Sequence, residues 1–142
     1  MINKRGFTLI ELLVVATIMV LLASSAAVAY SQFGRQSRDA KRRADLEQIR
    51  TAVEIYRSNL NEYPPSISFG GDLCDPAGCS TGIYLKSISN DPKAPYIYHY
   101  TRISANDYTI GAYLEGSNNT CGVSVACGSV NCNYCLGPYG QK

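Results

Sequence analysis

The chain offers little from which a catalytic centre could be built. It has no tryptophan and a single histidine, His99, which lies among tyrosines in a segment with strand character. Serines are plentiful, but none has a plausible base partner in the sequence, and a base within hydrogen-bond reach is what serine chemistry needs. We therefore expect His99 to be a half-buried structural residue. We also expect the protein not to be an enzyme, and to need neither a cofactor nor a metal.

The net charge is small, and prolines are absent from the sequence before Pro64. The 13 basic and 11 acidic residues give a formal charge of +2, and Lys4 and Arg5 precede a long apolar run, so the chain without these two would be neutral. A nearly neutral protein has little self-repulsion and tends to associate. No proline occurs before Pro64. The 142 residues therefore have room for a long helix and one modest domain.

The apolar run has the length of a membrane span. Phe7 to Tyr30 contain 24 residues, which as a helix would measure roughly 36 Å, enough to cross a bilayer core of about 30 Å. The basic flank predicts a cytoplasmic N-terminus with the remainder exported. Glu11 interrupts the run, and a carboxylate there costs roughly 2.5–3.5 kcal/mol, so it calls for a functional explanation.

Two other interpretations of this segment remain open. Ala27-Val28-Ala29 is an A-x-A-like signal peptidase site, and cleavage there would release a secreted, disulfide-rich binding domain after Ala29. The run is, however, longer than the roughly 7–15 apolar residues of an ordinary signal peptide. A plain uncleaved anchor would also fit the length, but it would give Glu11 no role.

The residues from Lys4 to Val15 carry a more specific pattern. They read KRGFTLIELLVV: a basic flank, then Gly6, Phe7, Thr, Leu, Ile and Glu11, then an apolar run. This order resembles the N-terminus of type IV pilins and of the related pseudopilins of type II secretion. The resemblance implies that a prepilin peptidase cuts between Gly6 and Phe7 and methylates the new terminal Phe7. It also implies that Glu11 attracts the charged terminus of a neighbouring subunit during assembly.

The resemblance further implies a function and a set of partners. The protein would be a structural subunit of a type IV pilus-like filament, built from copies of itself and minor pilins with the help of an inner-membrane platform protein. It would cross the inner membrane once before it enters a cell-surface pilus or a periplasmic pseudopilus. A type II secretion or competence pseudopilin is the alternative within the family. Many pseudopilin heads bind calcium through an acidic C-terminal loop, but no acidic residue follows Glu115 here.

Electrostatics gives an independent reason for the proposed role of Glu11. A free α-amine has a pKa near 8 and would be cationic at neutral pH. An unpaired amine and an unpaired carboxylate are both costly in a low dielectric, so pairing them between subunits relieves both costs. Phe7 and Glu11 are four residues apart, and a pair within one subunit is therefore also possible.

Apolar residues beyond the membrane-length run follow a helical period. Steps of three and four predict one stripe of an amphipathic helix that packs on a globular head. The stripe consists of Leu46, Ile49, Val53, Tyr56 and Leu60. The opposite, polar face carries Asp45, Glu47, Arg50, Glu54 and Arg57. Asparagines and prolines follow Leu60, and we expect the helix to end close to it.

A basic cluster lies between the apolar run and the stripe. It consists of Arg35, Arg38, Lys41, Arg42 and Arg43. We interpret it as a solvated helix face near the membrane. A contact with anionic lipid or nucleic acid is the alternative, but nucleic acid is not favoured because no aromatic residues alternate with these charges.

From Pro64 onward the composition changes to glycine, proline, serine, tyrosine and cysteine. Tyr96–Tyr100 and Tyr108–Leu114 are predicted strands with a turn at Asn106–Asp107, and 83–88 is a strand or a helical turn. An antiparallel hairpin or three-stranded sheet would pack on the helix stripe. Asn118-Asn119-Thr120 also fits a glycosylation sequon.

Six cysteines, all in this second half, indicate an oxidising compartment. They are Cys74, Cys79, Cys121, Cys127, Cys132 and Cys135. Disulfides are favoured over a metal site, because only one C-x-x-C pair is present. Six cysteines allow 15 connectivities. We expect a bond between Cys74 and Cys79 and two bonds within the tail.

The predicted fold class is α+β. A long N-terminal helix, first membrane-spanning and then amphipathic, packs on a small antiparallel sheet, and the C-terminus is loop-rich and braced by disulfides. The expected division is a leader peptide (1–6), a transmembrane and filament-core helix (7–30), its amphipathic continuation (31–62), and a small antiparallel β head with Cys-rich loops (63–142).

Overall fold

The computed structural model describes residues 6–142, and of residues 27–29 only the backbone. Lys4 and Arg5, and the side chains of the Ala27-Val28-Ala29 site, therefore lie outside the described residues. One helix, α1 (Leu9–Leu60), precedes all of the strands. The chain divides into two compact units, Met1–Arg35 and Gln36–Lys142, which are described separately below.

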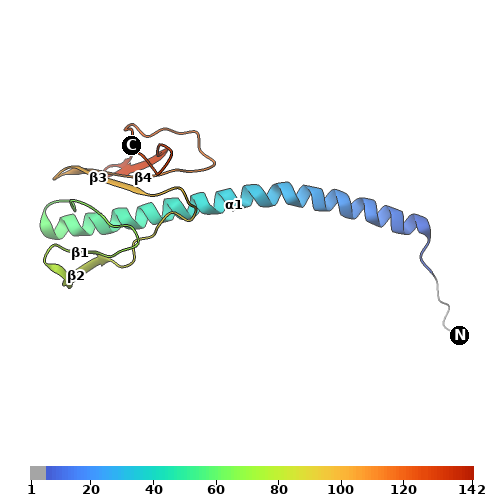
Figure 1. Cartoon of the computed structure of the whole chain (residues 1–142), viewed down its shortest axis with the longest axis horizontal. Helices are drawn as coiled ribbons and strands as arrows, with labels where there is room; N and C mark the ends of the chain where they lie inside the picture. Colours follow the sequence, from blue (N-terminus) through green and yellow to red (C-terminus); the bar gives the residue numbers. More distant parts are fainter. Residues whose placement is uncertain (1–5) are drawn as a thin grey trace. The chain divides into compact units, whose positions relative to one another are not determined.

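The described part of the N-terminal unit is helical from Leu9 onward and has no core of its own (Figure 1). Its large apolar side chains from Phe7 to Leu22 are 47–83% exposed. By length and composition alone, the helix is apolar enough to cross a membrane. An apolar surface of this extent needs lipid or protein to cover it.

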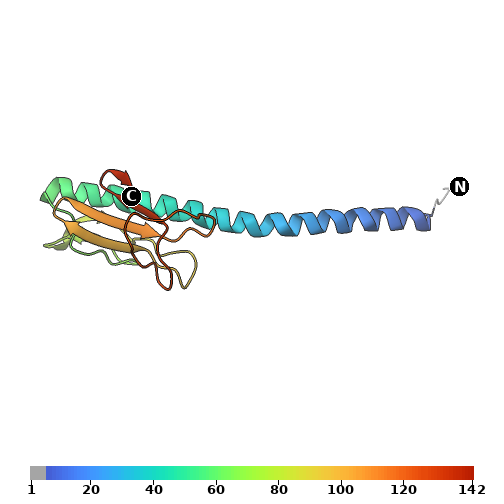
Figure 2. The same cartoon turned by 90° about the horizontal axis from the view of Figure 1, so that it is seen from above.

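The C-terminal unit combines the second half of α1 with two antiparallel sheets. A two-stranded hairpin has the order β1-β2, and a four-stranded sheet has the order β3-β4-β5-β6. Figure 1 shows the hairpin and the sheet on opposite sides of α1, and Figure 2 shows β3 and β4 running along it. The strands are β1 (Leu73–Asp75), β2 (Gly78–Leu85), β3 (His99–Ser104), β4 (Asp107–Ala112), β5 (Tyr134–Gly137) and β6 (Gly140–Gln141). The predicted α+β fold, with a long helix packed on small antiparallel sheets, is confirmed.

The predicted helix stripe forms the centre of the core. Leu46, Ile49, Val53 and Tyr56 are at most 3% exposed, and Leu60 packs against them at the edge. Side chains from both sheets and from the segments next to their strands cover the stripe: Tyr98, Tyr108, Ile110, Ala112, Leu136, Leu73 and Ile88. Burial on both sides is what holds the stripe of an amphipathic helix in place.

The helix ends where the sequence predicted. Asn61 follows Leu60 with a φ of 59°, and its N–H donates to the Arg57 carbonyl at 2.7 Å. Asparagine tolerates this left-handed conformation better than most residues, and the bond satisfies one of the last helical carbonyls.

Two details of the strands differ from the prediction. β3 begins at His99 rather than Tyr96, because Tyr96 N–H donates to the Lys93 carbonyl in a turn. The tail was expected to be loop-rich and no strand was predicted in it, yet it supplies β5 and β6 to the sheet. Residues 134–137 and 140–141 are too few to show a strand period, so only the pairing of β5 with β4 and of β6 with β5 reveals them.

All six cysteines are paired. Cys74 joins Cys79 across the β1–β2 hairpin, and the tail contains the bonds Cys121–Cys135 and Cys127–Cys132. The expected first bond and two tail bonds are thus present. Gly111 of β4 lies beneath the tail bonds, where an added Cβ would be 3.0 Å from Cys132 Sγ. A side chain there would push the tail away from the sheet.

Candidate functional site

The start of α1 is closed by a reciprocal cap. The Glu11 Oε2 atom accepts hydrogen bonds from the backbone N–H and the hydroxyl of Thr8, each at 2.8 Å, and the Thr8 hydroxyl accepts from Glu11 N–H at 3.3 Å. This is a capping box, in which a Thr at the N-cap and a Glu three residues later satisfy each other's free N–H groups. The spacing Thr-x-x-Glu is present in the sequence and is the signal that predicts this cap.

The capping box leaves part of the Glu11 carboxylate free. Both bonds from Thr8 go to Oε2, and within residues 6–142 no hydrogen bond reaches Oε1. The side chain is exposed, and so are Phe7 and Gly6 beside it. One oxygen can therefore cap the helix while the other accepts a further donor.

Hydroxyl groups farther along the apolar segment are satisfied within the helix. Thr17 donates to the Val14 carbonyl at 2.8 Å, and Ser24 and Ser25 donate to the Leu21 carbonyl at 2.9 and 3.0 Å. A polar group in hydrocarbon must find its partner inside its own segment or on a neighbouring helix. These bonds make the segment chemically suitable for lipid or for a packed helical bundle.

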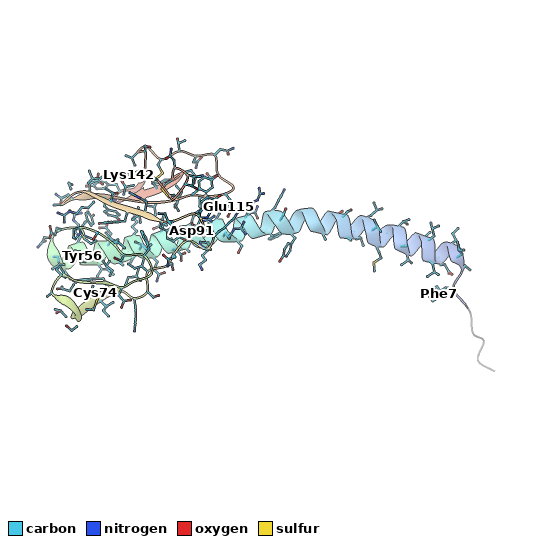
Figure 3. The ribbon with its side chains drawn as sticks, viewed as in Figure 1. Phe7, Tyr56, Cys74, Asp91, Glu115 and Lys142 are labelled. Carbon is cyan, nitrogen blue, oxygen red and sulfur yellow. A yellow bond between two sulfur atoms is a disulfide. The ribbon has the colours of Figure 1, made fainter. Side chains whose placement is uncertain are left out.

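A buried charge cluster lies in the C-terminal unit around Arg42, whose side chain is 0% exposed. Its Nε and Nη2 atoms donate to the two carboxylate oxygens of Asp91 at 2.8 Å each. Its Nη1 atom donates to Asp39 at 2.8 Å and to Glu115 at 3.1 Å. A forked guanidinium suits such bidentate pairing. We call the following set the Arg42 cluster: Arg38, Asp39, Arg42, Asp91, Lys93 and Glu115. Figure 3 labels two of its members, Asp91 and Glu115.

Further bonds join the Arg42 cluster to the backbone. Arg38 donates to both oxygens of Glu115 at 2.7 and 2.9 Å, and Lys93 Nζ donates to Glu115 at 2.8 Å. Asp39 accepts from the N–H groups of Glu115 and Gly116 at 2.9 and 2.8 Å. The cluster therefore fastens the segments around residues 91 and 115 to α1.

Mutual pairing keeps these groups ionised. The hydrogen bonds from Arg38 are the largest reason that the pKa of Glu115 lies well below 4.5; burial opposes them, and Lys93 and Arg42 add to them. Burial acts to lower the pKa of Arg42, but hydrogen bonds to Asp91 and Glu115 outweigh it, so this pKa is raised. Opposite charges at hydrogen-bond distance favour both ionised forms.

The Arg42 cluster corrects our interpretation of the basic segment. Arg35, Lys41 and Arg43 are exposed as expected for a solvated face, but Arg42 is a buried ion-pair partner. The signal was present in the sequence. Counting back from Leu46 by four and then by three continues the stripe to Arg42 and Asp39, so both lie on the buried face.

The predicted polar face of the amphipathic helix also contains two residues with buried partners. Tyr98 donates to Asp45 at 2.8 Å, and Tyr63 and Tyr108 donate to Glu54 at 3.1 and 3.0 Å. Burial is the main cause of the raised pKa values of Tyr98 and Tyr108. Both residues were placed on the polar face opposite the stripe, but Asp45 is buried and Glu54 is half-buried. The helix period places residues on a face, but it cannot show that tyrosines reach across to it.

Other candidates from the sequence take structural positions. His99 is partly buried in β3, beside Thr101. Cys132 and Cys135 are bonded to different partners, so their C-x-x-C spacing does not form a redox pair. Asn118 of the sequon is exposed.

Comparison with known proteins supports the N-terminal motif. Residues 1–27 match the family model described as the prokaryotic N-terminal methylation motif. Two curated relatives, both described as a probable minor fimbrial protein of Dichelobacter nodosus, are 33% and 32% identical to the chain over 91 residues. The match covers 64% of this chain and 55% of each relative, so it spans about half of their length. No solved structure matches significantly. The resemblance inferred from the sequence is thereby confirmed.

Proposed function

We propose that this chain, whose residues 1–27 match the prokaryotic N-terminal methylation motif, is a structural subunit of a pilus-like filament and not an enzyme. The observation that carries this proposal is the apolar surface from Phe7 to Leu22, 47–83% exposed, which leads into a head with a core of its own. Before assembly this surface would be covered by lipid. In the filament it would be covered by the same segments of other subunits, packed into a bundle.

Processing would prepare the chain for assembly. We propose cleavage between Gly6 and Phe7 by a prepilin peptidase, followed by methylation of the Phe7 amine. Phe7 is 83% exposed, and among the described residues after Phe7 no atom lies within 4 Å of a Cβ built on Gly6. The described side of the proposed cleavage site is thus accessible to an enzyme.

Glu11 would then have two partners. Oε2 would remain in the capping box with Thr8, and Oε1 would accept the methylated amine of a neighbouring Phe7. Each charge would otherwise stand alone in a low dielectric, so the pairing stabilises assembly and sets the axial offset between subunits.

The proposed partners and location follow from the same premise. Before assembly the protein would span the inner membrane once with a cytoplasmic N-terminus. It would meet the peptidase and a platform protein there, and then join copies of itself and minor pilins. The description of the two relatives as minor fimbrial proteins favours a surface pilus over a secretion or competence pseudopilus.

The mature N-terminus tests this proposal. Intact-mass and peptide mass spectrometry of the protein from its native membrane should find a chain that begins at Phe7 and carries one extra methyl group. A chain that begins at Tyr30 would instead show secretion after Ala29 and would refute the filament proposal. A chain that retains Gly6 would refute the processing step.

Two substitutions of Glu11 separate capping from charge pairing. Glutamine can replace glutamate in a capping box, so Glu11→Gln keeps the helix start and removes the charge. Glu11→Ala removes both. We expect both variants to accumulate in the membrane and neither to enter filaments, as measured by quantitative immunoblotting of sheared surface filaments. If Glu11→Gln assembles normally while Glu11→Ala does not, Glu11 acts as a cap and the charge-pairing role is wrong.

A further inference from the structure

A cavity of about 340 Å³ lies in the C-terminal unit beside the end of α1. Tyr56 on α1 and Cys74 on β1, both labelled in Figure 3, mark two of its sides. The loop between α1 and β1 supplies most of the remaining wall. This volume falls at the lower end of the roughly 300–1,000 Å³ of small-molecule sites.

One tyrosine hydroxyl in the cavity has no partner. Tyr56 is 3% exposed, and its ring packs on Tyr84 with centroids 5.1 Å apart. Within residues 6–142 the Tyr56 hydroxyl makes no hydrogen bond. Every side-chain N or O atom there that is fully buried does have a hydrogen-bond partner, so the Tyr56 hydroxyl is not fully buried. The hydroxyl must therefore be the part of Tyr56 that reaches the cavity. A nearly buried tyrosine normally satisfies its hydroxyl, so this one is free to bind a ligand.

Two carboxylates border the same cavity, and each has a free oxygen. Asp72 Oδ1 accepts from Ser87 N–H at 2.7 Å, and Glu62 Oε2 accepts from Arg102 at 3.2 Å. No hydrogen bond within the described chain reaches Asp72 Oδ2 or Glu62 Oε1. Both residues lie on a wall that also includes Ser66 and Ser68.

The charges of the residues that line the cavity limit the charge of a ligand. None of the lining residues in the described chain is a lysine, arginine or histidine, while two are carboxylates. An anionic ligand such as a phosphate or an acidic sugar would meet repulsion from these carboxylates, and Arg102, which lies beside the wall, already pairs with Glu62. The ligand must be neutral or cationic.

The hydrogen-bonding groups that line the cavity distinguish a neutral ligand from a cationic one. The Tyr56 hydroxyl can accept a hydrogen bond, but its own proton also needs an acceptor, whereas the carboxylate oxygens need only donors. An ammonium group only donates, but an alcohol hydroxyl both donates and accepts. Three prolines and Ile67 add apolar surface for the C–H face of a ring. We propose that this cavity binds one neutral sugar residue, with its hydroxyls between Tyr56 and the carboxylates of Asp72 and Glu62.

Binding can be measured on the full chain in a zwitterionic detergent that has no sugar headgroup. The probes are methyl glucoside, methyl galactoside and N-acetylglucosamine, followed by saturation-transfer NMR and calorimetry. For a ligand of this size we expect a Kd on the order of millimolar. Because the measurement uses dispersed protein, its result does not depend on filament assembly.

Three variants locate the binding. Tyr56→Phe removes only the free hydroxyl and should weaken binding about three- to tenfold. Asp72→Asn should also weaken it, while its side-chain oxygen still accepts from Ser87. Tyr139→Phe is the matched control, because Tyr139 is 92% exposed and does not line the cavity. Circular dichroism should show the same folded spectrum for all three.

Three results would overturn the proposal. The first is that none of the three sugars binds. The second is that a sugar binds to the folded Tyr56→Phe and Asp72→Asn variants as well as it binds to wild type. The third is that N-acetyl-lysine amide, a cationic probe, binds while the sugars do not, in which case the cavity receives a basic side chain of another protein.

Discussion

Removal of the Arg42 side chain should destabilise the C-terminal unit more than any other single charge change. The substitution Arg42→Met keeps an unbranched apolar chain and deletes four hydrogen bonds to carboxylates. The consequences for those carboxylates differ. Asp39 keeps two backbone N–H donors, and Glu115 keeps Arg38 and Lys93. Asp91 has a fully buried side chain and, within residues 6–142, keeps only the hydrogen bond from the Lys93 N–H at 2.9 Å.

The magnitude follows from Asp91. A buried ion pair that loses one partner costs about 3–5 kcal/mol, because the remaining charge has no compensation. Whole domains are stable by about 5–15 kcal/mol, so Arg42→Met should remove a large share of the stability of the unit. The double variant Arg42→Met/Asp91→Leu removes both charges and should be more stable than Arg42→Met alone. Arg42→Lys should fall between wild type and Arg42→Met, since an ammonium cannot make the two-pronged contact.

Equilibrium unfolding by guanidinium is the assay, with the full chain in a zwitterionic detergent. The 11 tyrosines and the absence of tryptophan make near-ultraviolet circular dichroism of tyrosine the natural probe. Arg43→Met is the matched control, because Arg43 is exposed and its guanidinium carbon only lies 5.7 Å from the Tyr134 ring centroid. We expect the control to cost no more than about 1 kcal/mol. Equal losses for Arg42→Met and Arg43→Met would refute the account of the cluster.

Two further predictions concern acid and the tail. The pKa of Glu115 is lower in the folded unit than its ordinary value of 4.5, so its contribution to stability is complete above pH 4.5 and declines as the pH falls below it. Unfolding free energies measured over an acid titration should show this decline in wild type and a smaller one in Glu115→Gln. Parallel curves for the two proteins would contradict this. Replacing Cys121 and Cys135 by alanine opens a loop with a sequence separation of 14 and should cost about 2–4 kcal/mol, measured as a lower midpoint in guanidinium, whereas an unchanged midpoint would show that the tail contributes nothing to the fold.

The C-terminal half of the helix shows how far periodicity reaches. Apolar spacing predicted the stripe from Leu46 to Leu60 and its packing on a globular head, because a helix face repeats at fixed intervals. The asparagines and prolines after Leu60 predicted where the helix ends. The same spacing continues to Arg42, but because arginine is charged we predicted that its side chain would be exposed to solvent. Its burial depends on Asp91 and Glu115, which are 49 and 73 residues away in sequence. No local pattern connects residues so far apart.

The sequence by itself determined the N-terminal motif, the membrane-length apolar run and the helix stripe, because each is a local order or period of residue types. It also indicated the Cys74–Cys79 bond, since five residues can close a small hairpin. The tertiary structure decided the tail pairing and the addition of β5 and β6. It likewise decided the Arg42 cluster and the free hydroxyl of Tyr56. These features arise only when segments distant in sequence bring charges, sulfurs and hydroxyls within bonding distance, or leave one of them without a partner.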